Sequence, residues 1–172
     1  YWHYGTTYNV MLLAALETLY GNDFGLSAIP GFIKGGEYIL HMVGPSCLPF
    51  NFGDSGSRMR LNTSLFWFAR KTKNPALLRN ECKLLLEIPN YDYEQYRRML
   101  PSIFVLGKDI NLANLPKPKV DMFAAKNEAP VCLMRSSWKE DAIYVGIKGG
   151  KASANTHTHL DAGSFVMDAQ GV

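Results

Sequence analysis

Two imidazoles and a carboxylate stand at alternate positions near the end of the chain, at His157, His159 and Asp161. If this segment is extended, the three side chains project to one face, because successive residues of a strand point to opposite sides. Histidine is the usual side chain for proton transfer near neutral pH and a common zinc ligand, so both chemistries are open here. The structural alternative is a polar strand whose histidines cap a turn, and the short His-x-His pattern does not decide between them.

The segments expected to position these residues change character along the chain. Helical spacing and capping residues predict helices at 1–20, 32–43, 61–71, 75–87 and 93–99. Residues 44–57 are rich in Gly, Pro and aromatic side chains and are expected to form a long loop. After a Pro- and Lys-rich stretch at 114–119, alternating patterns predict strands at 120–125, 129–136, 142–148 and 163–169. Helices followed by antiparallel strands predict an α+β protein of two packed units.

Composition narrows the classes of function. The chain has 172 residues, of which 47% are hydrophobic, so it can bury a substantial core. A net charge of +3 suits an anionic partner but is too small for a nucleic-acid binder. Three separated cysteines indicate no disulfide framework, and no apolar run reaches the roughly 20 residues of a membrane span. Because the chain opens without Met in what is predicted to be a helix, we expect it to be an excerpt of a longer protein.

The predicted first helix carries a row of phenols. Tyr1, Tyr4 and Tyr8 are spaced by three and four residues, so they share one helix face. Such a stripe is typical of core packing, but tyrosine rings also line sugar-binding grooves, since each offers an apolar body and a hydroxyl. Both interpretations stay open at this point.

Three further polar residues have two interpretations each. Asn51 and Asp54 lie in the aromatic loop, where Asn and Asp stabilise turns and also orient ligands. Arg135 ends a predicted strand, where it either decorates a hairpin or pairs with a substrate carboxylate or sulfate through its planar fork of donors.

Taken in order, these segments resemble heparinase II/III-type polysaccharide lyases over nearly the whole chain. The resemblance is carried by residues 1–8, 50–55, 135–138 with Asp141, and 155–165, of which the last segment is the most specific. It implies that residues 1–115 form the end of an (α/α) toroid and that residues 116–172 begin an antiparallel β-sandwich. It also implies a bacterial enzyme that is periplasmic or secreted.

The resemblance further implies β-elimination on a uronate-containing anionic polysaccharide of the heparin or heparan sulfate kind. Tyr1 and His157 match the catalytic acid–base pair, and His159 matches a ligand of a structural zinc. The expected substrate-binding residues are Tyr4, Asn51, Asp54, Arg135 and Asn155. Because zinc normally takes four ligands, the metal site is expected to be incomplete in this chain. The resemblance also implies that the Asn or His that neutralises the substrate carboxylate lies upstream of Tyr1, so we expect the excerpt alone to be inactive.

Two other functions remain open from the sequence. A non-catalytic carbohydrate-binding module would use the aromatic face and loop without chemistry. A glycoside hydrolase on a related toroid would need two carboxylates flanking the scissile bond, and no pair among Glu37, Asp54 and Asp161 is indicated. Neither a nucleic acid nor a membrane is an expected partner, and the sequence leaves the oligomeric state open.

Overall fold

The computed structural model describes residues 2–87, 99–126, 129–150 and 159–171. The chain divides into two compact units. The helical unit comprises Tyr1–Gly36 and Arg60–Pro116, and the sheet unit comprises Glu37–Met59 and Lys117–Val172. Residues 37–59 therefore belong with the strands, although they lie among the helices in the sequence.

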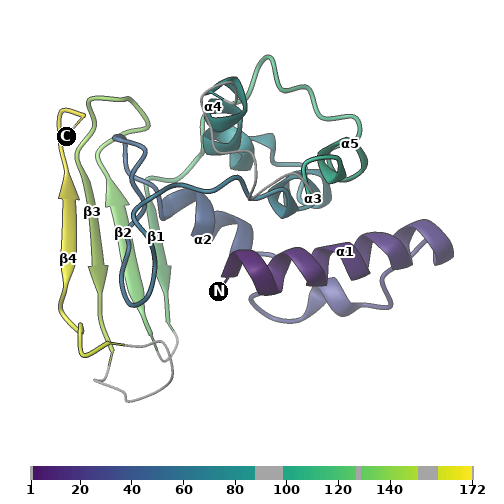
Figure 1. Ribbon diagram of the computed structural model, residues 1–172, viewed down its shortest axis with the longest axis horizontal. Coiled ribbons are helices and arrows are strands. Elements are labelled where there is room, and N and C mark those ends of the chain that lie inside the picture. The colour runs from purple at the N-terminus through teal and green to yellow at the C-terminus, as the bar shows by residue number, and fades with distance from the viewer. Residues whose placement is uncertain (1, 88–98, 127–128, 151–158, 172) are drawn as a thin grey trace. The chain divides into compact units, whose positions relative to one another are not determined.

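The helical unit is built on one long helix and several short ones (Figure 1). Its elements are α1 (Trp2–Tyr20), η1 (Leu26–Ala28), α3 (Ser64–Lys71), η2 (Pro75–Leu78), α4 (Arg79–Glu87) and α5 (Ser102–Leu106), while α2 (Gly35–His41) runs on into the sheet unit. The predicted helix over 1–20 is confirmed in its described part, and it ends before Gly21, whose φ of +73° suits a glycine. Most of the helix predicted at 93–99 lies outside the described residues.

Helix α3 is the centre of the helical unit. Every side chain from Ser64 to Ala69 is buried, and the helix contacts α1, η2 and α5. At Gly36 an added Cβ would lie 3.2 Å from the Cβ of Phe68 and 3.3 Å from a methyl group of Leu77, so the chain approaches this helix closely there. Such burial of aromatic and aliphatic side chains is the main force that stabilises short helices in proteins.

The described residues of the sheet unit form an antiparallel sheet in the order β1-β2-β3-β4. Its strands are β1 (Met122–Ala125), β2 (Val131–Arg135), β3 (Tyr144–Lys148) and β4 (Phe165–Asp168), and Figure 1 shows β4 in yellow at one edge. All four lie inside the ranges predicted from alternation. Each strand pairs with its neighbour in sequence, which is the arrangement that short connections favour.

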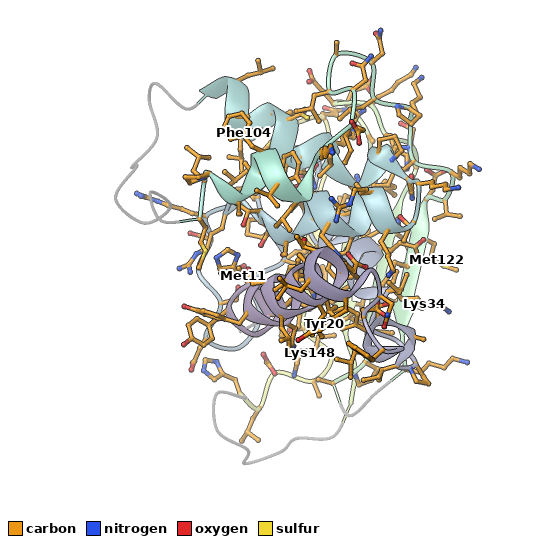
Figure 2. The ribbon with its side chains drawn as sticks, turned by 90° about the vertical axis from the view of Figure 1, so that its right-hand side faces the viewer. Met11, Tyr20, Lys34, Phe104, Met122 and Lys148 are labelled. Carbon is orange, nitrogen blue, oxygen red and sulfur yellow. The ribbon has the colours of Figure 1, made fainter. Side chains whose placement is uncertain are left out.

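The two faces of the sheet differ in the polarity of the side chains that they carry. The register aligns Met122, Met134, Val145 and Met167 in one row and Ala124, Cys132, Ile147 and Phe165 in the next, so the outer face is apolar throughout. Met122 is 59% exposed and projects outward from β1 in Figure 2. The inner face carries Leu133 and Tyr144, which form a core with Phe50, but also the charged side chains of Arg135, Lys148 and Asp168.

The predicted fold class was wrong. In the described part of the chain, five α-helices and a single four-stranded sheet form neither an (α/α) toroid nor a β-sandwich. A toroid needs repeated pairs of long helices, whereas α2 to α5 span only five to nine residues each. A sandwich needs two sheets, whereas all four strands pair in sequence into one. Periodicity predicts individual elements and carries little information on how they close into layers.

A substitution at Gly146 tests how the aromatic loop, residues 44–57, packs against the sheet. An added Cβ there would lie 2.7 Å from the ring of Phe50 and 3.2 Å from Val166. We expect Gly146→Ala to lower the free energy of unfolding by about 1–3 kcal/mol through overpacking, measured by denaturant titration. Gly56→Ala is the control, since an added Cβ at Gly56 meets no atom within 4 Å, and equal stability of the two variants would contradict this packing.

Candidate functional site

Two of the segments singled out in the sequence meet in the sheet unit. The backbone amide of Gly53 donates to Oδ2 of Asp161 at 3.1 Å, and Nε2 of His159 lies 2.9 Å from Oδ1 of Asp54. Neighbouring residues of the aromatic loop are therefore bound by two residues of the His-x-His-x-Asp segment. In its described part, residues 159–161, this segment is coil with a bend and not a strand.

A buried lysine holds the same carboxylate. Nζ of Lys148, at the end of β3, donates to Oδ1 of Asp161, and the side chain of Lys148 is 7% exposed. The hydrogen bond from Lys148, followed by the Gly53 amide, keeps the pKa of Asp161 below its usual range. The main chain of Lys148 also binds this turn, because its N–H donates to Ser164 and its carbonyl accepts from Gly163.

The exposed part of this cluster is an imidazole–carboxylate pair. The side chains of His159 and Asp54 are 55% and 45% exposed, so solutes reach them. When Nε2 carries a proton it donates to Asp54, which fixes the ring's orientation. A histidine oriented by a carboxylate is suited to moving a proton or to binding an anionic group. We refer to His159, Asp54, Gly53, Asp161 and Lys148 together as the loop–turn cluster.

The described residues do not supply a zinc site. Zinc takes four ligands in structural sites, whereas His159 has one carboxylate neighbour and the second carboxylate, Asp161, is bound to Lys148. No group of three or more His, Cys, Asp or Glu side chains suited to a metal occurs within 2–87, 99–126, 129–150 and 159–171. We therefore derive no step through a metal, and zinc binding at His159 stays a prediction.

Arg135 lies at the other end of the inner sheet face. Its guanidinium stacks over the ring of Trp138 at 3.6 Å and donates to the carbonyl of Val43 at 2.9 Å. Beside it, His41 is 1% exposed, and burial followed by the charge of Arg135 lowers the pKa of His41 to about 4. The positive charge of Arg135 is thus combined with aromatic packing and a backbone hydrogen bond.

The other predicted site residues are distributed between the units. Asn51 is exposed in the aromatic loop of the sheet unit. Tyr4 belongs to the helical unit, is 68% exposed and makes an edge contact with Tyr8 at 5.0 Å between ring centroids. Three predicted residues lie outside the described part of the chain, namely Tyr1, Asn155 and His157.

A buried polar network in the helical unit was not predicted from the sequence. Nδ2 of Asn62 donates to Oε1 of Glu81 at 3.1 Å, and Oδ1 of Asn62 lies 2.9 Å from Nδ1 of His3. Glu81 is 1% exposed, its Oε2 has no hydrogen-bond partner among the described residues, and burial raises its pKa to about 7. Helical spacing contained a signal, because Glu81 falls between Leu77 and Leu84 on one apolar stripe.

No protein-family model matches the chain, and no curated protein is significantly similar to it. None of the helices in the described segments combines the length and hydropathy of a membrane span.

Glu81 gives stability a specific pH dependence. Its pKa is about 7 in the folded state against 4.5 ordinarily, so the folded protein binds the proton more tightly and stability falls as pH rises from about 4.5 to 7. A glutamine at this position cannot ionise but still accepts a hydrogen bond from Asn62. We expect Glu81→Gln to gain about 2–3 kcal/mol relative to wild type between pH 5 and pH 8.

The measurement is denaturant unfolding at both pH values. The control is Glu140→Gln, at an exposed glutamate of the sheet unit. A difference between Glu81→Gln and wild type that does not change with pH would contradict the buried, titrating carboxyl.

Proposed function

We propose that the protein acts as a lyase on uronate-containing anionic polysaccharides, cleaving them by β-elimination. The reaction and substrate class come from the resemblance to heparinase II/III-type lyases. The observation that best supports the proposal is the loop–turn cluster, in which residues 53–54 contact residues 159 and 161. Two segments that carry the resemblance, more than a hundred residues apart in sequence, thus join in one polar, partly exposed site.

β-Elimination makes three demands on such a site. The substrate carboxylate must be neutralised as negative charge develops at C5, a base must remove the C5 proton, and an acid must protonate the departing oxygen at C4. We assign proton transfer to Tyr1 and His157, as the resemblance implies. A phenol has a pKa near 10 and becomes an effective acid or base when neighbouring positive charge lowers that pKa.

Among the described residues, the exposed His159–Asp54 pair supports this chemistry, because His159 follows His157 by two residues in the same segment. Because Nε2 faces Asp54, the Nδ1–H is the ring donor that remains for a sugar hydroxyl or carboxylate. The chain's net charge of +3 favours the approach of a polyanion. Tyr4, with an exposed ring, is a candidate for stacking on a sugar.

The proposal predicts an unsaturated product. We expect the full-length protein to raise ultraviolet absorbance with at least one of heparan sulfate, hyaluronan, chondroitin sulfate and alginate. Tyr1→Phe and His157→Ala should each lower kcat by about 100-fold or more, the usual contribution of a general acid or base. Tyr20→Phe, at an exposed tyrosine of α1, is the matched control and should keep the wild-type rate.

Other outcomes identify the competing functions. Binding of these polysaccharides without any absorbance change would overturn the lyase proposal in favour of a carbohydrate-binding module. Release of reducing ends without ultraviolet-absorbing product would favour a glycoside hydrolase. Near-normal rates in both variants would overturn the assignment of Tyr1 and His157.

A further inference from the structure

We propose that Lys148 is a positioning residue of the lyase site, which holds Asp161 where it binds the Gly53 amide and thereby sets Asp54 against His159. This inference rests on the proposed function, since the position of His159 matters to catalysis only if the segment takes part in the reaction. No contact between Lys148 and substrate is involved.

The first support is the placement of Lys148 itself. It is the only lysine that is buried within the described residues, with 6% of its surface exposed, and Nζ lies 5.7 Å from the ring centroid of Phe52. Removing an ammonium group from water is costly unless a counter-charge and hydrogen bonds compensate. Asp161 supplies that counter-charge, so the lysine and the carboxylate are expected to hold each other in place.

The second support is that the two oxygens of the Asp161 carboxylate bind different segments of the chain. Oδ1 of Asp161 accepts from Lys148 on β3, and Oδ2 accepts from the amide of Gly53 in the aromatic loop. A single side chain thus joins three separate stretches of the sheet unit. The Asp161 side chain is 20% exposed, so without Lys148 it is free to turn toward water, and the loop loses its acceptor.

The third support is exposure, which separates positioning from contact. The Lys148 side chain is 7% exposed, whereas those of His159 and Asp54 are 55% and 45% exposed. A polysaccharide therefore reaches the imidazole–carboxylate pair but not the lysine. Lys148 acts on the reaction only through the residues it holds.

The test compares Lys148→Met, which keeps the apolar stem without the charge, with Lys148→Arg, which keeps the charge. NMR chemical shifts of the Gly53 amide and the His159 ring report position independently of activity. In Lys148→Met we expect both signals to move and kcat/KM to fall about 10- to 100-fold, mostly in kcat, as is typical when the groups that orient an active site are removed. The NMR signals and rate of Lys148→Arg should stay closer to those of the wild type than do those of Lys148→Met. Lys139→Met, at an exposed lysine, is the control and should match the wild type in both.

The double variant Lys148→Met with Asp161→Asn covers the case in which Lys148→Met fails to fold. It leaves no unpaired buried charge, so we expect it to recover thermal stability while the His159 signal and the rate stay altered. Recovery of the wild-type rate along with stability would overturn the positioning role.

The inference and the proposed function fail in different ways. Unchanged Gly53 and His159 signals in a folded Lys148→Met protein would overturn the positioning role, whatever the activity. A wild-type protein inactive on every polysaccharide would overturn the lyase proposal and, with it, the effect of Lys148 on catalysis. The NMR shifts would still report whether Lys148 sets the contact of Asp54 with His159.

Discussion

The ion pair between Lys148 and Asp161 is the interaction on which the candidate site depends. Opposite charges of low exposure stabilise each other only with good geometry and further hydrogen bonds, and Asp161 obtains one from the Gly53 amide. The pair lies where a strand, a loop and a turn come together. Desolvation offsets much of the attraction in pairs of this kind, so its main effect is on structure: it specifies which loop residues face His159.

The sheet unit explains why a loop from the first half of the chain joins the strands. Phe50 packs against Gly146, which has no side chain to hold it away, and joins Leu133 and Tyr144 in the core. This contact fixes one end of the aromatic loop, and Asp161 fixes the part that follows. The charged residues of the sheet lie on the same inner face and find their partners outside the strands. Arg135 donates to the carbonyl of Val43, and Lys148 donates to Asp161. Asp168 accepts from the amide and hydroxyl of Ser46.

Sequence patterns predicted the elements well and their assembly poorly. The apolar spacing of residues 2–20 and the alternation around each strand gave boundaries close to those observed, because both depend on local geometry. Arrangement depends on contacts between distant residues, so the toroid and sandwich were wrong. The meeting of Asp54 with His159 could not be derived from spacing. The inward position of Lys148 was not predicted either, although this residue shares a face with Tyr144 and Gly146 at every second position of its strand.

One of the two apolar rows on the outer face of the sheet carries three methionines, whose side chains can be oxidised. Met122 and Met167 are 59% and 65% exposed, and the register places Met134 and Val145 between them across the strands. Thioethers at such positions are accessible to peroxide, and each sulfoxide formed turns an apolar side chain into a polar one. Oxidising conditions would therefore convert this row from water-avoiding to water-binding one sulfur at a time, without breaking a backbone hydrogen bond of the sheet.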